Sequence, residues 1–352
     1  MQDIAGYCRI KEIVQIRSHF LEAELQRSVL HHSFDEQPIA DLSLKNLDLE
    51  KAKQSFQKIG RDLDEEKMRS LGITVPVAKR FSPSIGGLIL FGKQTERQQY
   101  IHDARVSCAR FLGNDKVEIL DRFDVEGTIL DAVDAVPKFV ARNTRLAAEI
   151  RGMQREDISE YPPVGIREAL INALVHSDYS LTGSRIQVAI FDNRLEIQNP
   201  GMLPFGFTLE DLKQGVSRVR NRVIARVFSE LRLMEAWGSG YKRIIEACRS
   251  GGYPEPEWKE LGASLRVTFF PHPKTFLERT QKATSNTEEL IPRQISILNQ
   301  FSEVDNLSFR QIMENLHLSI SERSLRYDLA HLKNLGFLIP KGKGRATIWH
   351  RR

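Results

Sequence analysis

The sequence predicts an α+β protein in which one helical layer covers a mostly antiparallel sheet, followed by a small helical unit at the carboxyl end. Two observations support this fold class. Between Pro163 and Pro271 the pattern runs helix, two strands, loop, helix and strand. Beyond a polar, proline-marked stretch at 272–290, short amphipathic helices lead into two short strands, as in a helix-turn-helix unit.

The composition is that of a globular protein. The chain has 352 residues, of which 41% are hydrophobic and 28% are charged, and this length predicts two or three domains. It contains no uncharged apolar stretch of about 18 residues and no signal-peptide pattern, so we expect a cytoplasmic protein without a membrane partner. Its 3 cysteines stand far apart, which excludes a disulfide framework and a thiolate zinc site.

The first 150 residues predict a mixed helical and α+β region without a sharp internal boundary. Apolar residues at helical spacing alternate there with short apolar runs such as GGLILFG, which we interpret as strands. The predicted helices cover 10–32, 41–72 and 128–150, and the predicted strands cover 86–92, 105–113 and 117–127.

Residues 151–271 form the predicted α/β sandwich. A helix within REALINALVHSDYS precedes two strands, SRIQVAIFDN and RLEIQNPG, which an Asp-Asn turn connects. A loop and a helix extend from Phe207 to Leu233. The segment AWGSGYKRIIEACRSGG then predicts a helix opened by glycines, and LRVTFFP predicts a closing strand.

Three short motifs in this region suit a nucleotide. Glu168 and Asn172 share one helix face, where an amide can bind Mg²⁺ and a carboxylate can orient a water. Asn199 and Gly201 follow the second strand, where an acceptor beside a tight turn suits a flat base. The Gly-Ser-Gly at 238–240 opens a helix whose N–H groups can bind an anion. Each motif alone also fits a structural role, as a solvated helix face, a turn or a helix start.

The order of these motifs resembles the Bergerat-fold, GHKL-like ATP-binding domain shared by gyrase, the large heat-shock chaperones, histidine kinases and MutL. The phrases REALINALVHSDYS, RLEIQNPGMLP, SRVRNRVIARVF and EAWGSGYKRIIEACRSGGYPEP are most similar to the branch found in transcriptional regulators and in proteins described as RecG-related. The similarity is close over about 160–270 and looser over 33–160. Relatives usually begin with a Schlafen AlbA-type domain, so the resemblance implies that residues 1–150 are a remnant of that region plus a connector.

The resemblance implies ATP and Mg²⁺ as cofactors and assigns residues by position. Glu168 would be the catalytic residue that orients the attacking water in a weak ATPase, and Asn172 would hold Mg²⁺ through the nucleotide. The residues implied to contact the adenine, the phosphates or a closing lid are Asn199, Gly201, Ser217, Arg220, Asn221, Gly238 and Gly240. Two interpretations of His176 stay open: it lines the same pocket, or its charge stabilises the end of its helix.

Residues 291–352 predict a DNA-binding unit. Capping-box spacings at 308–311 and 319–322, the latter beginning at Ser319, open two short helices joined by a turn. The segment SERSLRYDL in the second helix resembles the winged helix of DeoR-type regulators. The leucines expected to face the core of this unit are Leu325, Leu329 and Leu332.

The charge distribution favours a polyanionic partner for this unit. Residues 322–352 hold eight basic residues against two acidic ones, a net charge of +6, whereas the whole chain carries +5. We expect contacts with double-stranded DNA from the second helix and from the basic turn between the last two strands. The residues assigned to these contacts are Arg323, Arg326, Tyr327, Lys341, Lys343 and Arg345. The alternative is a solvated helix followed by a basic tail.

These features predict a DNA-binding transcriptional regulator whose GHKL-like domain, at 151–271, senses ATP or a related ligand. A homodimer would let two terminal units read paired half-sites. The alternatives are an ATP-hydrolysing enzyme of DNA processing and a scaffold whose nucleotide site has decayed. No G-x-x-x-x-G-K-[ST] motif occurs in the chain, which excludes a P-loop helicase motor.

Overall fold

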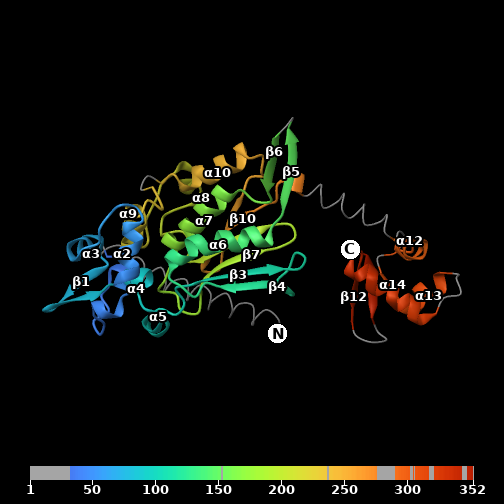
Figure 1. The fold of residues 1–352 in the computed structure, drawn as a ribbon, viewed down its shortest axis with the longest axis horizontal. Coiled ribbons are helices and arrows are strands. Elements are labelled where there is room, and N and C mark those ends of the chain that lie inside the picture. The colour runs from blue at the N-terminus through green and yellow to red at the C-terminus, as the bar shows by residue number, and fades with distance from the viewer. Residues whose placement is uncertain are drawn as a thin grey trace, which may run out of the picture. The chain divides into compact units, whose positions relative to one another are not determined.

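The computed structural model of the chain consists of two compact units, Met1–Thr275 and Phe276–Arg352, each with its own hydrophobic core (Figure 1). The described residues are 32–151, 154–235, 238–275, 290–301, 304, 306–316, 321–342 and 347–351. The helix predicted at 10–32, apart from its last residue, and most of the predicted linker lie outside them. Within these ranges, no helix combines the length and the hydropathy needed to cross a membrane.

A six-stranded sheet forms the centre of the first unit, with the strand order β4-β3-β7-β8-β10-β9. β3 and β7 pair in parallel and every other neighbouring pair is antiparallel, which confirms the predicted α+β class and its mostly antiparallel sheet. The strands are β3 (Val106–Phe111), β4 (Ile119–Asp124), β7 (Ile186–Ile190), β8 (Leu195–Pro200), β9 (Glu257–Leu261) and β10 (Ser264–Phe269).

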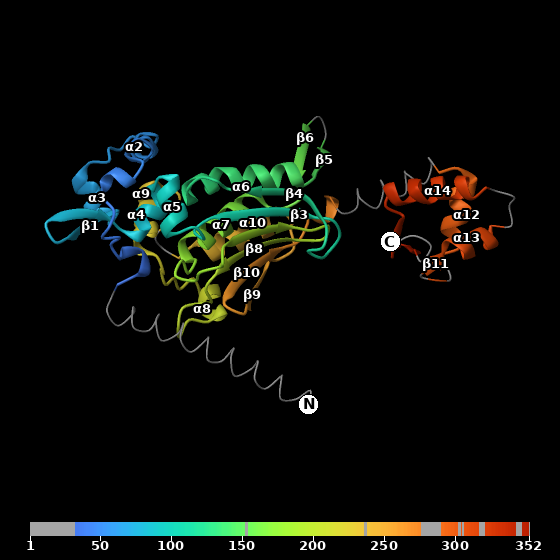
Figure 2. The same ribbon diagram turned by 90° about the horizontal axis from the view of Figure 1, so that it is seen from below.

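Helices cover one face of this sheet, as Figures 1 and 2 show. Alternate strand residues such as Val188 and Ile197 point to that face and belong to the main core. Leu170 and Leu174 pack into the same core from the central covering helix and are completely buried. The covering helices are α6 (Ile129–Asn143), α7 (Pro163–His176) and α10 (Gly240–Ser250), and the segment between β8 and α10 contains α8 (Leu209–Gln214) and α9 (Arg222–Glu230).

Strands β3 and β4 and helix α6 precede residue 150 but belong to this layered structure. Val106 of β3 stands opposite Ile186 of β7, so the first half of the chain contributes strands to the same sheet. The division between residues 1–150 and 151–271 that the sequence suggested therefore does not coincide with a break in the sheet. Parallel pairing joins strands that are far apart in the sequence, and no local pattern marks such a junction.

The part of the first unit that precedes β3 differs most from the prediction. GGLILFG was expected to be a strand, but Ile85–Phe91 forms helix α4, and the Ser84 hydroxyl caps it by accepting a hydrogen bond from Gly87 N. Periodicity cannot distinguish a short, continuously apolar strand from a helix that is buried on every side, which α4 is. The other elements here are η1 (Phe34–Glu36), η2 (Leu44–Asn46), α2 (Leu49–Gln57), α3 (Glu65–Leu71), β1 (Thr74–Val77), β2 (Arg80–Pro83) and α5 (Gln94–Tyr100).

The single helix predicted over 41–72 is divided into η2, α2 and α3. After α2, Gly60 adopts a φ of +72°, and Asp64 then caps α3 by accepting a hydrogen bond from Lys67 N. A left-handed residue ends a helix, so a local turn interrupts the helical spacing of apolar residues at this point.

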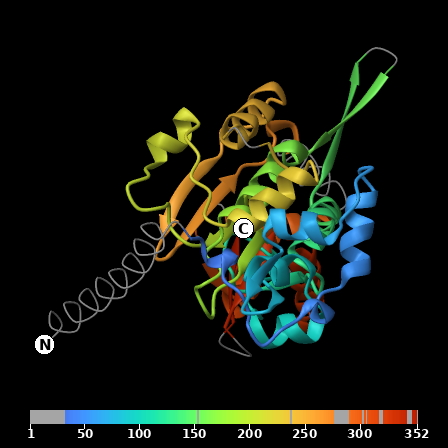
Figure 3. The same cartoon turned by 90° about the vertical axis from the view of Figure 1, so that its left-hand side faces the viewer.

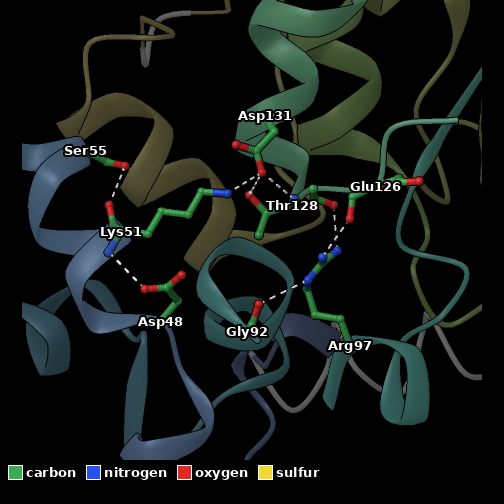
Figure 4. Close-up of polar contacts among 9 residues, drawn as sticks. Asp48, Lys51, Ser55, Gly92, Arg97, Glu126, Thr128 and Asp131 are labelled. Carbon is green, nitrogen blue, oxygen red and sulfur yellow. Dashed lines mark hydrogen bonds and ion pairs between the residues drawn. The ribbon is translucent and has the colours of Figure 1, made fainter. Parts of the chain in front are cut away.

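Polar contacts attach α2 and α5 to the start of α6 (Figure 4). Lys51 Nζ of α2 lies 2.5 Å from Asp131 Oδ2, and the same carboxylate oxygen accepts a hydrogen bond from Thr128 N at 2.6 Å. Arg97 of α5 donates to the main-chain oxygens of Gly92, Glu126 and Gly127. The helical amino-terminal part is therefore held to the layered part by side-chain contacts as well as by the common core.

Helix α6 ends at Asn143, short of the predicted end at residue 150, and an antiparallel hairpin follows it. The hairpin consists of β5 (Leu146–Arg151) and β6 (Gln154–Ser159), which form a separate two-stranded sheet. It projects from the body of the unit (Figure 3), and the Tyr253 hydroxyl donates to Ser159 O at its base.

Where the structure describes it, the second unit forms three helices and a three-stranded sheet of order β11-β13-β12. Ser308 and Gln311 form the predicted capping box of α13. Ser319 lies outside the described residues, and the cap of α14 is Ser321, which accepts a hydrogen bond from Ser324 N. All three leucines of the predicted stripe are buried. The elements are α12 (Pro292–Asn299), β11 (Asn306–Ser308), α13 (Phe309–Asn315), α14 (Glu322–Asn334), β12 (Leu338–Lys341) and β13 (Ile348–Arg351).

Candidate functional site

A cavity lies between α7, the end of β8 and the start of α10. The chain segment that connects β8 to α9 forms another wall. Most of the ligand-contacting residues implied by the resemblance line this one cavity, namely Asn172, Asn199, Gly201, Ser217, Arg220, Gly238 and Gly240. Glu168 and Asn221 are not among the described residues that line it.

Asn172 lies on the side of α7 that borders the cavity. Its neighbours Leu170 and Leu174 are completely buried, and this burial fixes the rotation of the helix. The Asn172 amide makes no hydrogen bond with the part of the chain that the structure describes. A Cβ on Gly240 would come within 2.8 Å of Asn172 Nδ2, so glycine is required for α10 to begin this close to the amide.

Asn199 is buried near the end of β8, opposite Leu265 of β10. Its Nδ2 donates a hydrogen bond to Pro200 O at 3.0 Å. Because the amide nitrogen must face that carbonyl, the amide oxygen is left as an acceptor in a residue that lines the cavity. An acceptor in this position suits an exocyclic amino group such as that of adenine.

Gly201 makes room for the side chain of Arg220. Its φ is +97°, and a Cβ there would lie only 2.4 Å from Arg220 Nη1. The Arg220 guanidinium donates to His176 O at 2.8 Å and to Met202 O at 2.7 Å. Arg220 therefore joins the end of α7 to the chain that follows β8, and it stands at the cavity wall already engaged with protein acceptors.

Residues 203–217, which we call the covering segment, lie against the start of α10. Gly238 has a φ of +66°, and a Cβ there would lie 2.5 Å from Gly215 O and 3.1 Å from Ser217 Cβ. Gly238 and Gly240 thus meet protein atoms at the place where the resemblance implied phosphate contacts. A triphosphate at the start of α10 requires the covering segment to move away.

Apolar and aromatic side chains form much of the cavity wall. The rings of Tyr241 and Trp258 have centroids 4.7 Å apart, and Ile197 and Val267 line the cavity from the sheet. A wall of this kind suits the flat face of a base. Trp258 was not among the predicted site residues, because β9 carries no alternating pattern: its apolar residues Trp258 and Leu261 stand three positions apart.

Glu168 is buried on α7, one turn before Asn172. It lies 3.5 Å from Arg243 of α10 and 3.7 Å from Arg167. Burial raises the pKa of the Glu168 carboxyl group above its usual range, and the two arginines oppose that rise. A raised pKa makes a carboxylate a better proton acceptor near neutral pH.

His176, the last residue of α7, lines the cavity. Burial and, to a smaller extent, the nearby Arg220 guanidinium lower the pKa of His176 to about 4, so the imidazole is neutral at neutral pH. This favours a role in the cavity over that of a cation at the helix end. Asn221 has a structural contact instead: its Nδ2 donates to Val175 O at 2.8 Å and to Ser177 O at 2.7 Å. Its side chain satisfies carbonyls at the end of α7, which removes it from the cavity.

The residues assigned to DNA contacts belong to the second unit. Arg326 and Tyr327 are exposed on α14, Tyr327 to 71%. Arg326 forms an ion pair with Glu322 at 3.2 Å, and Lys341 is the exposed last residue of β12. The side chain of Arg323 and the whole of Lys343 and Arg345 lie outside the described part of the chain.

Part of the first unit matches a known protein family. Residues 183–269 match the family model described as "Putative ATP-dependent DNA helicase recG C-terminal". The matched range runs from β7 to β10 and includes the covering segment and α10, but it begins after α7. This part of the chain is therefore an ATPase-like domain related to the RecG carboxyl-terminal family.

Among solved structures, the DIP2311 protein from Corynebacterium diphtheriae has a similar fold, with a TM-score of 0.57 and 20% sequence identity. The alignment covers 96% of this chain and 67% of that chain. At this identity the similarity concerns the fold alone. A search of curated proteins finds no match.

Proposed function

We propose that the cavity binds an adenine nucleotide and that the protein is a nucleotide-responsive, DNA-binding regulator. The observation that carries the nucleotide part is that Asn172 and Asn199 bring amide groups without a described partner for their oxygens to one cavity with an aromatic wall. Buried polar groups normally have hydrogen-bond partners, so a ligand with a complementary donor accounts for the unused oxygen of the buried Asn199, while the half-buried Asn172 offers its oxygen at the cavity wall. Adenine offers an amino donor to Asn199, and a nucleotide-bound cation suits the oxygen of Asn172.

Mg²⁺ bound with the nucleotide would supply charge neutralisation at the phosphates. The residues of this chain would do the positioning. Asn172 would hold the ion from α7, and Asn199 would orient the base. The Arg220 guanidinium donates to His176 O and Met202 O, and a change of its rotamer away from these carbonyls would let it present a fork of donors to phosphate oxygens.

Calorimetric titration of the full chain with a non-hydrolysable ATP analogue and MgCl₂ tests this proposal. We expect Asn172→Ala to weaken binding at least about tenfold, because the variant loses a ligand to the cation. The control is Asn193→Ala in the exposed turn between β7 and β8, which should bind like the wild type. Equal affinities for the wild type and Asn172→Ala, or a wild type that fails to bind at millimolar nucleotide, would contradict the proposal.

We infer that the second unit is a winged helix and that it contacts double-stranded DNA. The helices α12, α13 and α14, the three-stranded sheet and the exposed Arg326 and Tyr327 on α14 support this interpretation. Replacement of Lys341, Lys343 and Arg345 by glutamine should reduce the salt dependence of duplex binding by about 0.9 in log–log slope for each phosphate that the variant no longer neutralises. Fluorescence anisotropy across a salt series measures that slope, and an unchanged slope would remove the basic turn from the interface.

ATP hydrolysis is a second candidate function, which the raised pKa of Glu168 favours, although its carboxylate is paired with Arg243 and does not line the cavity. The carboxylate stands one helical turn from Asn172, as a water-orienting base beside a bound cation would. Phosphate release that disappears in Glu168→Gln, while nucleotide binding persists, would establish the enzyme. If the wild type binds the nucleotide but releases no phosphate, the result favours the regulatory role over the enzyme.

A further inference from the structure

The face of the six-stranded sheet opposite the covering helices carries a row of amide and cationic side chains that the nucleotide cavity does not use. Cross-strand register places Gln187 of β7 opposite Gln198 of β8, Gln198 opposite Arg266 of β10, and Arg266 opposite Lys259 of β9. Residues that stand opposite one another share a face of the sheet. The alternate residue Val188 belongs to the core beneath the helices, so the row faces away from them.

Two further cations lie beside this row. Arg194, at the turn before β8, donates through Nε to Glu196 Oε1 at 2.7 Å, and Arg266 Nη1 donates to the same oxygen at 3.2 Å. Lys116 Nζ lies 3.4 Å from Gln187 Oε1. One buried carboxylate, that of Glu196, therefore serves both arginines.

Positive charge on this face exceeds what the neighbouring carboxylates offset. The cations are Lys116, Arg194, Lys259 and Arg266, which we call the cationic face. Besides the carboxylate of Glu196, this face has that of Glu257 on β9, opposite Thr268. The Asp124 carboxylate at the far edge of the sheet is already paired with Arg122. Desolvation lowers the pKa of Lys116, and Arg266 and Arg194 lower it further while Glu196 opposes them. Mutual repulsion of this kind is relieved when an anion binds.

The two arginines have the chemistry to receive phosphate. A guanidinium offers five N–H donors in a planar fork that matches phosphate oxygens. The described contacts of Arg194 use three of these donors, and those of Arg266 also use three. Both side chains are about one quarter exposed, at 24% and 25%. Donors therefore remain on both groups for a ligand that approaches from solvent.

We propose that the cationic face binds the phosphate backbone of double-stranded DNA, as a contact separate from the second unit. Four neighbouring strands span about 14 Å, which is enough for more than one phosphate, and glutamine amides commonly contact phosphate and sugar oxygens. The other polyanion to consider is an acidic protein segment. Protein interfaces centre on aromatic and apolar anchors, and the row formed by Gln187, Gln198, Arg266 and Lys259 contains none.

The full chain with Lys116→Gln and Lys259→Gln tests the proposal. Both side chains are exposed, and the substitutions leave the two arginines on Glu196, so the fold should persist. In anisotropy titrations with duplex DNA, we expect the log–log salt slope to flatten by about two units, since each neutralised phosphate contributes about 0.9. The control pair Lys53→Gln and Lys58→Gln removes the same charge from exposed positions on and beside α2 and should leave the slope unchanged.

Lysine acetylation followed by mass spectrometry distinguishes the two polyanions. Duplex DNA should protect Lys116 and Lys259 but not Lys53 and Lys58, and polyglutamate at equal charge should protect the first pair much less. Identical salt slopes in the two double variants, absence of protection by the duplex, or equal protection by polyglutamate would each overturn the proposal. Nucleotide titration of the same variants measures binding in the cavity independently. Failure of one proposal therefore does not contradict the other.

Discussion

Gly201 lets the side chain of Arg220 reach the cavity wall, because it has no side chain of its own. Gly201→Ala should lower the free energy of unfolding by about 2–3 kcal/mol, because it combines a left-handed φ of +97° with displacement of Arg220. Gly206→Ala is the matched control: its φ of +75° is also left-handed, but nothing lies within 4 Å of the added Cβ, so about 1 kcal/mol is expected. Urea denaturation measures the loss of unfolding free energy in both variants. Equal losses would show that displacement of Arg220 adds nothing to the cost of the left-handed φ.

Asp35 gives the protein a pH-dependent stability. Its carboxylate is completely buried and accepts a hydrogen bond from Ile224 N in the first turn of α9. Burial raises the pKa of Asp35 from 3.8 to about 6, so the folded state holds this proton more tightly than the unfolded chain does. The contribution of this group is therefore most favourable below pH 4 and is lost as the pH rises through 6, by about 3 kcal/mol in total.

Asp35→Asn should remove this dependence, since the amide keeps an acceptor for Ile224 N without a charge. We expect the stability of the variant relative to the wild type to rise by about 3 kcal/mol between pH 4 and pH 7. Denaturant titrations at several pH values supply the comparison, in which the other carboxyl groups cancel. A difference that does not vary with pH would mean that Asp35 titrates normally.

The start of α6 shows how one element is held to its neighbours. Asp131 closes the capping box with Thr128 and also pairs with Lys51 of α2 (Figure 4). We expect Asp131→Ala to destabilise the protein by about 1–2 kcal/mol, because it removes both the cap and the attachment of α2. Asp134→Ala, an exposed position in the next turn, should cost less than about 0.5 kcal/mol. Similar thermal shifts for the two variants would argue against the cap.

At the same scale, the covering segment is the element that must move for a ligand to enter. Gly215 and Ser217 lie against Gly238, just before α10, and Gly215 also lies close to Lys242 of α10. These are a few polar and backbone contacts, whereas α7 and the strands beneath it share a continuous apolar core. Segments with few buried apolar contacts open at low free energy, so the closed cavity is compatible with a nucleotide site.

At the scale of the whole molecule, the regulatory proposal requires coupling between nucleotide and DNA. We expect the ATP analogue to change the affinity for duplex DNA by about 5- to 150-fold, which corresponds to 1–3 kcal/mol. The duplex must then change nucleotide affinity by the same factor, because coupling free energy is reciprocal. Anisotropy and calorimetry on the full chain measure the two factors, with Asn172→Ala as the variant that should lose both. If neither ligand changes the affinity of the protein for the other, the regulatory proposal is refuted.

The sequence alone determined those parts of the protein that local chemistry specifies. Helical periodicity located α7, α10 and α14, alternation located β7 and β8, and a capping box located α13, because each depends on residues a few positions apart. The same local spacing placed Asn172 one turn after Glu168 on a common helix. It also identified the acceptor and the glycine at the end of β8.

The meeting of distant segments depends on the three-dimensional fold. The apolar run at Ile85–Phe91 became a helix because its surroundings bury every side of it, and β3 joined β7 across some eighty residues of chain. Whether an amide faces a ligand or a carbonyl is settled in the same way: Asn172 borders the cavity, whereas Asn221 is bonded to the end of α7. Hydrogen-bond partners and burial depend on neighbours in space, and a local pattern does not contain them.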